Sequence, residues 1–392
     1  MLNKEKLLNS LEGNGNIAKR TSLKHLLKLE KNNPELVPIQ KELVPLHFTS
    51  NIYYSLYSPT MCAYFAHKSG CSAVAVNDYA NLLAYKELKK ACNLLSLLYA
   101  CGYHVEIKPL FKEKKAVMYG YGAGVNDYKK ITKALSEVCL MKKEEVLKKI
   151  KQINEEIKNY GISINEKAVL KNKLHVTTEK DIAKNLAEIL VDKFGKNEEL
   201  LDFLKNALKI DSCENDLRFI KEQGNVYFIE DLAKVIYTKY AILNYKGKKP
   251  DCKRFIELNS SFGVISSYKI SVKSYDEKEL SNIAETLISY GFNAVTFKCS
   301  ELANLETQKI IDFFINKGLL PISLYRMGLP RQHLPSGEVS NQAYLNSLAV
   351  VGNAISVNCD KDDGLFGANT VKLCSDLRKR IDVFANIVKG KR

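Results

Sequence analysis

The sequence lacks features that define several classes of protein. No run approaches the roughly 18 uninterrupted apolar residues that a membrane-spanning helix needs, and the opening residues, MLNKEKLLNSLEGNGN, have no apolar core of the kind found in secretory signals. Proline is scarce, with 9 residues in 392, and the 20 glycines are spread along the chain. These absences exclude collagenous and low-complexity proteins. We therefore expect a globular protein of the cytoplasm without a membrane partner.

Closely spaced cysteines are also absent. The chain has 10 cysteines, but no two lie closer than nine residues apart, and the sequence contains no CxxC. A zinc ribbon or a thioredoxin-like redox centre requires cysteine pairs at short spacing. Scattered thiols are typical of small buried hydrophobic residues, so neither function is expected.

Arginine is rare although the chain is strongly basic. The formal net charge is +15, yet only 8 of the 59 basic residues are arginines, and the lysines are interspersed with Glu and Asp. Arginine makes the forked contacts to bases and phosphates on which nucleic-acid recognition depends. Nucleic acid is therefore not the expected partner. A Lys-rich nucleic-acid or assembly factor remains the second alternative function.

Strand and helix signals alternate in the first third of the chain. Strand-like segments at 44–48, 72–78 and 103–109 are separated by helical segments, of which the second is expected over 81–101. A further strand-like segment covers 116–122. This alternation is typical of parallel strands joined by right-handed crossovers.

The pattern changes after residue 125 and later returns. Residues 126–250 show helical periodicity and almost no strand signal. Alternation resumes with strand-like segments at 262–270, 292–297 and 320–325. A terminal helix is expected from Asn369, as its N-cap, to about Lys389.

We therefore expect one α/β domain that is interrupted by an insertion. Residues 1–43 form an N-terminal helical arm, residues 44–125 and 251–392 form the split α/β domain, and residues 126–250 form the helical insertion. Two series of alternating strands and helices fit one interrupted barrel or doubly wound sheet better than two independent domains.

Polar side chains follow the expected strands at their carboxyl ends, where reactive residues gather in parallel α/β folds. Tyrosine rings with hydroxyl tips would suit a small polar ligand, and two arginines five residues apart would suit an anion such as a phosphate group. The candidate ligand-binding residues are Tyr54, Tyr79, Tyr119, Arg326 and Arg331. His47, Asp78 and Glu106 are candidate metal ligands.

The segments LHFTSNIYYSLYSP (46–59), SAVAVNDYANL (72–82) and YHVEI (103–107) resemble the PHP family, named for polymerase and histidinol phosphatase. The segments at 291–300 and 330–332 resemble an uncharacterised subgroup of that family. The resemblance implies a PHP-like distorted (βα)7 TIM-type barrel. It also implies descent from metal-dependent phosphoesterases that hold two or three metal ions.

The chain departs from the family at most of the metal ligands. His47 falls on the first histidine of the family's His-x-His motif, but Thr49 replaces the second. Tyr54 and Tyr79 replace an aspartate and a histidine. The carboxylates retained at family positions are Asp78 and Glu106. One histidine and two carboxylates are too few for a two-metal hydrolase.

Each retained residue also has a purely structural interpretation. His47 would serve as a hydrogen-bonded structural histidine at a strand end. Asp78 would equally serve as a cap at the entry to a helix, and Glu106 would pair with a lysine. Both interpretations stay open from the sequence alone.

The favoured hypothesis is a non-catalytic ligand-binding or regulatory pseudoenzyme that uses the old cleft for a small polar or phosphorylated ligand. Its pocket would have His47, Asp78 and Glu106 in the floor and tyrosines in the wall. The alternative is a reduced phosphoesterase, a hydrolase that uses one divalent metal (Mn, Fe or Zn) on these three residues. The expected cofactor is thus either none or a single divalent metal, and the oligomeric state stays open.

Overall fold

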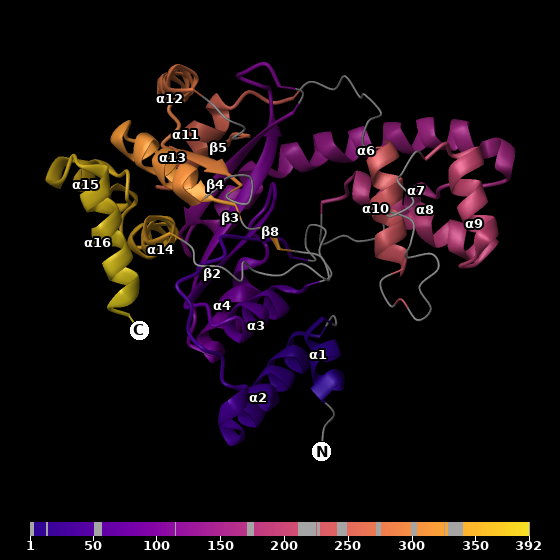
Figure 1. The fold of residues 1–392 in the computed structure, drawn as a ribbon, viewed down its shortest axis with the longest axis horizontal. Helices are drawn as coiled ribbons and strands as arrows, with labels where there is room; N and C mark the ends of the chain where they lie inside the picture. The colour runs from indigo at the N-terminus through magenta and orange to yellow at the C-terminus, as the bar shows by residue number, and fades with distance from the viewer. Residues whose placement is uncertain are drawn as a thin grey trace. The chain divides into compact units, whose positions relative to one another are not determined.

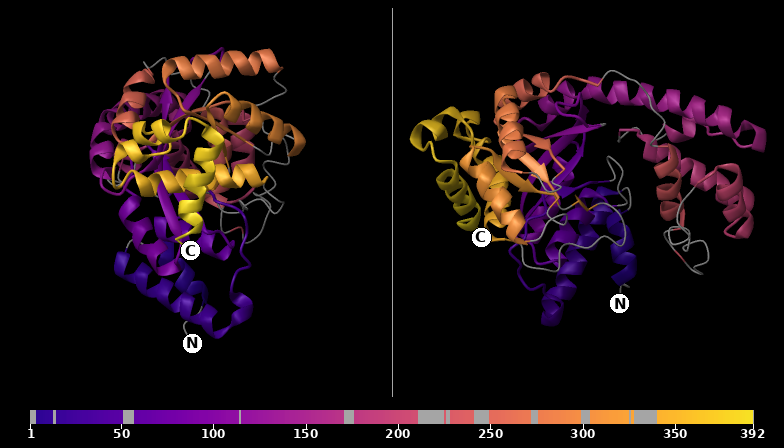
Figure 2. Two further views of the ribbon diagram at one scale, coloured as in Figure 1. Left: turned by 90° about the vertical axis from the view of Figure 1, so that its left-hand side faces the viewer. Right: turned by 45° about the horizontal axis from the view of Figure 1, so that its top comes forward.

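The computed structural model describes residues 4–12, 15–50, 57–113, 115–170, 176–210, 225, 228–240, 249–271, 276–298, 304–324, 326–327 and 340–391. Contacts within the chain divide it into two units. The sheet unit consists of Met1–Ser136 and Lys249–Arg392, and the helical unit consists of Glu137–Lys248. Figures 1 and 2 show the ribbon of both units. No described helix combines the length and the apolar character needed to cross a membrane.

The described residues of the sheet unit form one eight-stranded sheet in the order β7-β6-β5-β4-β3-β2-β1-β8. β4 runs antiparallel to both of its neighbours, and the other pairs are parallel. The strands are β1 (His47–Phe48), β2 (Ala73–Tyr79), β3 (Leu98–Ile107), β4 (Ala116–Ala123), β5 (Ile265–Lys269), β6 (Ala294–Phe297), β7 (Leu320–Ser323) and β8 (Arg326–Met327).

The sheet curls without closing. β7 and β8 stand at opposite ends of the strand order, yet only two residues separate Ser323 from Arg326. Three residue steps span at most about 11 Å, so the two ends of the sheet come near each other at this point. No ladder of hydrogen bonds joins β7 to β8 among the described strands. The prediction of a TIM-like α/β fold is confirmed at this level, but the prediction of a complete (βα)7 barrel is wrong.

Eleven described α-helices accompany the sheet in this unit. The C-terminal helices α14, α15 and α16 lie together in the views of Figures 1 and 2. The helices are α1 (Lys4–Glu12), α2 (Asn16–Asn32), α3 (Pro59–Lys68), α4 (Tyr85–Leu95), α5 (Tyr128–Ala134), α11 (Lys253–Ser261), α12 (Glu277–Tyr290), α13 (Asn304–Asn316), α14 (Asn341–Ser356), α15 (Ala368–Leu373) and α16 (Leu377–Lys389). Ser58 caps α3 through its hydroxyl, which accepts from the Met61 N–H at 3.1 Å.

Side-chain alternation gives the sheet a helix-covered face and an inner face. The Tyr103 hydroxyl of β3 donates to Asn259 of α11 at 2.7 Å, and the ring of Phe48 in β1 contacts that of Phe65 in α3 at 6.0 Å between centroids. Tyr103 and Phe48 therefore mark the helix-covered face. The alternate residues of the same strands lie on the inner face.

Helix α14 covers one end of the sheet. The Asn346 amide donates to the Pro321 carbonyl in β7 at 2.9 Å, and the Asn353 amide donates to the carbonyls of Gly122 and Gly263 at 3.1 and 2.9 Å. Because β4 is antiparallel, its last residues lie level with the first residues of the parallel strands. α14 thus packs against the amino-terminal ends of the parallel strands.

Two predicted helices end differently in the structure. The helix expected over 81–101 is α4, which ends at Leu95, and β3 begins at Leu98. Ser96 terminates α4 in the left-handed conformation, with φ 54°, which a serine seldom adopts and which the sequence pattern does not reveal.

The expected terminal helix from Asn369 to about Lys389 is interrupted. It consists of α15, which has Gly367 as its N-cap, and α16. The Asp376 carboxylate accepts from the Arg378 N–H at 2.8 Å and starts the second helix.

The close crossing of α14 and α16 requires a glycine at position 352. A Cβ atom there would lie 2.2 Å from the Phe384 carbonyl oxygen in α16. We expect Gly352→Ala to lower the free energy of unfolding by at least about 2 kcal/mol in denaturant titrations, because the two helices must separate. Gly390→Ala, where the nearest atom would be 3.4 Å away, is the matched control. Equal stability of both variants would contradict this account.

The helical unit has its own hydrophobic core. Its described residues form α6 (Ser136–Ile157), α7 (Glu166–Val169), α8 (Glu179–Phe194), α9 (Glu198–Asp202) and α10 (Phe228–Tyr240), and α6 begins one residue before the unit. Fully buried side chains of this core include Ile150, Leu186, Leu204, Leu232 and Ile236.

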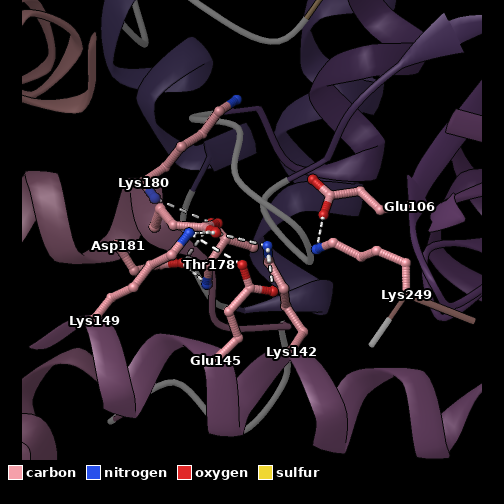
Figure 3. Close-up of polar contacts among 9 residues, drawn as sticks. Glu106, Lys142, Glu145, Lys149, Thr178, Lys180, Asp181 and Lys249 are labelled. Carbon is pink, nitrogen blue, oxygen red and sulfur yellow. Dashed lines mark hydrogen bonds and ion pairs between the residues drawn. The ribbon is translucent and has the colours of Figure 1, made fainter. Parts of the chain in front are cut away.

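Two lysines and two glutamates form a closed ring of ion pairs in the helical unit. Lys142 lies 3.3 Å from Glu145 and 2.7 Å from Glu179, while Lys149 lies 3.1 and 2.5 Å from the same two carboxylates. Figure 3 shows the α6 side chains beside Thr178 and Asp181, which form the capping box of α8. Burial acts to raise the pKa of Glu179, but the two ammonium groups hold it well below its usual range.

Breaking this ring should destabilise the helical unit. We expect Glu179→Gln to cost about 3–5 kcal/mol, because it leaves two buried ammonium groups with one carboxylate. Hydrogen exchange of α6 and α8 would measure the loss as faster exchange. Glu155→Gln, which removes the exposed pair with Lys158, is the control and should leave exchange unchanged. Unchanged exchange in Glu179→Gln would rule out a stabilising role for the ring.

Candidate functional site

His47 lies on the inner face at the start of β1. Its ring contacts the rings of Tyr119 in β4 and His104 in β3, with centroid distances of 5.1 and 5.6 Å. The β1–β2 register aligns Phe48 with Val76, so these two residues share a face. His47 lies on the opposite face, which also carries Tyr79. His47 is 2% exposed, so this imidazole belongs to the interior of the sheet unit.

His104 is the inner-face histidine that the sequence reasoning missed. It faces Tyr119 across the β3–β4 ladder and is aligned with Tyr79 of β2, whose ring centroid lies 5.5 Å from its own. Its Nδ1 lies 3.1 Å from the side-chain oxygen of Asn77, within hydrogen-bond distance. The available signal was the spacing of His104 and Glu106, because residues two apart on a strand share a face.

These side chains form a compact set that we call the ring cluster, defined as His47, Tyr79, His104, Tyr119 and Tyr121. Tyr119 and Tyr121 stack at 5.3 Å, and Thr296 of β6 donates to the Tyr121 hydroxyl at 3.4 Å. All five residues are buried, with exposures between 1% and 7%. The cluster places imidazole nitrogens and phenol hydroxyls on the inner face, groups that can donate or accept hydrogen bonds.

Asp78 lies on the helix-covered face. It is aligned with Tyr103 of β3, and its two carboxylate oxygens accept from the Ser50 N–H at 2.7 Å and the Ser50 hydroxyl at 2.6 Å. Burial raises the pKa of Asp78 to about 6, although the two Ser50 bonds act to lower it. The expected pocket floor of His47, Asp78 and Glu106 is therefore divided between two faces of the sheet.

Glu106 lies on the inner face, two residues beyond His104. Its carboxylate pairs with the Lys249 ammonium at 2.6 Å, as Figure 3 shows, and the two side chains are 25% and 30% exposed. The Lys108 N–H donates to the Pro250 carbonyl at 2.9 Å and fixes the segment that carries this lysine beside β3. Lys249 is 143 residues away in sequence, and no local pattern could have identified it as the partner.

The remaining predicted site residues are described in part. Arg326 pairs with His47 across the β1–β8 ladder, so their backbones are neighbours. Tyr54 and Arg331 lie outside the described residues.

The described side chains do not fit the metal centre that the PHP resemblance implies. Among them, no group of three or more His, Cys, Asp or Glu residues is arranged to hold a metal ion. The Glu106 carboxylate is bound to Lys249, and Asp78 faces the helices. The two imidazoles of the ring cluster lie against tyrosine rings.

Comparison with known proteins gives a likeness in fold. No family model matches the chain, and no curated protein matches it. One similar solved structure is described as a "putative metal-dependent phosphoesterase" from Bifidobacterium adolescentis, with 12% identity, a TM-score of 0.53, and coverage of 80% of this chain and 97% of that one. Another is an amidohydrolase from Chromobacterium violaceum with bound sulfate and no metal, with 13% identity, a TM-score of 0.49, and coverage of 75% and 92%.

The buried carboxyl group of Asp78 predicts a defined pH dependence of stability. Its pKa is raised on folding, so the charged form is disfavoured in the native state. The penalty is absent well below pH 3.8, where both states are protonated, grows as pH rises toward about 6, and is complete above that pKa. Asp78→Asn should therefore be more stable than the wild type by about 2–3 kcal/mol at pH 7.5 and nearly equal to it at pH 4. Denaturant titrations at both pH values measure this difference.

Ser50→Ala provides the complementary test. It removes a donor that favours the charged carboxylate, so its loss of stability should be larger at pH 7.5 than at pH 4. An Asp78→Asn protein that is less stable than the wild type at pH 7.5 would contradict the assigned burial cost.

Proposed function

We propose that this chain is a non-catalytic binding protein with the fold of a phosphoesterase, and that it binds a small polar or phosphorylated ligand at the carboxyl ends of β1 to β3. The Glu106–Lys249 pair, the partly exposed element of the inner face, would meet the ligand first. The ring cluster lies beneath this pair on the same face and would orient polar groups of the ligand through hydroxyls and imidazole nitrogens. Metal-dependent hydrolysis is not part of the proposal.

The observation that carries this proposal is the occupation of the inner face by side chains. An enzyme that activates water on metal ions needs convergent ligands and access for solvent. Here the carboxylate of Glu106 is engaged by a lysine, and His47 and His104 are at most 7% exposed among tyrosine rings. The fold shared with the protein from Bifidobacterium adolescentis described as a "putative metal-dependent phosphoesterase" supports descent from such an enzyme.

A reduced hydrolase with one metal is the second candidate. The observation in its favour is the pair of imidazoles from His47 and His104, whose centroids are 5.6 Å apart on one face. A divalent ion such as Mn, Fe or Zn would need further ligands that the described residues do not supply as a group.

Metal analysis and phosphatase assays of the purified chain decide between the two candidates. We expect substoichiometric metal and no hydrolysis of p-nitrophenyl phosphate or its diester with added Mn²⁺, Fe²⁺ or Zn²⁺, in the wild type and in His104→Ala alike. Stoichiometric metal together with turnover, both lost in His104→Ala, would overturn the proposal in favour of the reduced hydrolase.

Binding is tested separately with inorganic phosphate and ribose 5-phosphate as probes. We expect slower hydrogen exchange at the ends of β3 and β4, residues 104–118, and a weaker effect in Lys249→Gln. Lys115→Gln, a change in an exposed lysine with no described ion pair, is the control. The absence of protection at 104–118 with both probes would contradict the proposed ligand class.

A further inference from the structure

A cavity of about 650 Å³ opens at the opposite end of the parallel strands from the ring cluster. Its walls come from the linker before β1, the turn between α3 and β2, the connection between α4 and β3, and the residue Lys391 that follows α16. Leu98, which lines it, begins β3 six residues before His104, or about 20 Å along an extended strand. The cavity is therefore separate from the proposed site at the carboxyl ends, and its size is that of a small-molecule site.

The charged residues around the cavity are mainly basic. Its lining contains His67 and Lys391 and no Asp or Glu. The nearby carboxylate of Glu30 is already neutralised, because it binds His67 at 2.8 Å and Lys68 at 3.3 Å. Lys41 lies close enough to Cys71 for its charge to oppose the rise in the thiol pKa that burial causes. A ligand with a negative charge would thus meet unbalanced positive charge.

The C-terminal ends of α3 and α4 at the cavity disfavour an anion, but their effect is weaker than that of the lysines. α3 and α4 both end here, and each helix C-terminus carries roughly half a negative charge. The last carbonyls of α3 are already engaged, since the N–H groups of Ser69, Gly70 and Cys71 donate to them. Full charges on Lys41 and Lys391 therefore outweigh the partial charge at the end of α4.

Four exposed polar residues line the cavity. They are Gln40, Asn93, Ser96 and Lys391, and none of their side chains forms a hydrogen bond or ion pair among the described residues. Between them lie apolar groups, of which Val37 is 55% exposed. A mixture of apolar wall and unengaged polar groups is the composition of a binding site for an amphipathic small molecule.

We propose that this cavity binds a small organic anion, a carboxylate or phosphate ester with an apolar body. The anionic group would contact Lys391, Asn93 and Ser96, and the apolar body would cover Val37 and Pro38. This site is independent of the proposed function, because it uses none of the residues of the ring cluster or the Glu106–Lys249 pair.

Benzoate and phenyl phosphate are suitable probes, with benzylamine as the cationic counterpart of the same size. Calorimetry should show binding of at least one of the two anions and none of benzylamine. Hydrogen exchange should slow at residues 37–41 and 92–98. Binding of benzoate alone would assign a carboxylate ligand, and binding of phenyl phosphate alone would assign a phosphate ester.

Two variants test the contacts without endangering the fold. Lys391→Gln should weaken binding about tenfold, because a charge-assisted contact is lost, whereas Lys389→Gln, an exposed lysine outside the lining, should not. Ser96→Gly removes the hydroxyl and relieves a left-handed serine, so binding should weaken while thermal stability is kept or raised.

Three results would overturn the proposal. They are the absence of binding by both anions, binding of benzylamine as tight as that of the anions, and equal weakening by the two lysine substitutions. Protection at 104–118 in place of 37–41 and 92–98 would also overturn it, and would assign the anion to the other site.

Discussion

The alternation of side chains along β1 to β4 decides which chemical groups in this protein act together. His47, Tyr79, His104 and Tyr119 come from four strands, yet parity and register place all four rings on the inner face. The same rule removes Asp78 from that set, although it is adjacent to Tyr79 in sequence. A one-residue shift in the β2–β3 register would move Tyr79 to the helix-covered face and Asp78 to the inner face. The composition of the site is therefore set by the register of the backbone hydrogen bonds.

The order of strands and helices was predictable from local signals. Which side chains share a face of the sheet was predictable in part. Ser58 and Pro59 are the N-cap and the first residue of α3, which is a local start signal, and the strand-like segment at 72–78 predicts β2. His104 was also within reach, because it precedes Glu106 by two residues on a strand. The comparison with the family's ligand positions did not identify His104, because it considers the residue type at each position and not which side chains share a face of the sheet.

Other features depend on contacts that no local pattern encodes. The partner of Glu106 lies 143 residues away, beyond the helical unit. The antiparallel direction of β4, in contrast, follows from a local feature, its short connection to β3, which leaves no room for a crossover helix. The Asp376 cap starts α16 and separates it from α15, although the sequence on both sides has helical periodicity.

Only two residues connect β7 to β8, so covalent chain length limits the distance between the two ends of the open sheet. Elsewhere neighbouring strands are held by ladders, which can slip by whole residues, but here the separation of the sheet's ends has a fixed upper limit. The connection acts as a tether. It limits how far the two ends of the sheet can separate.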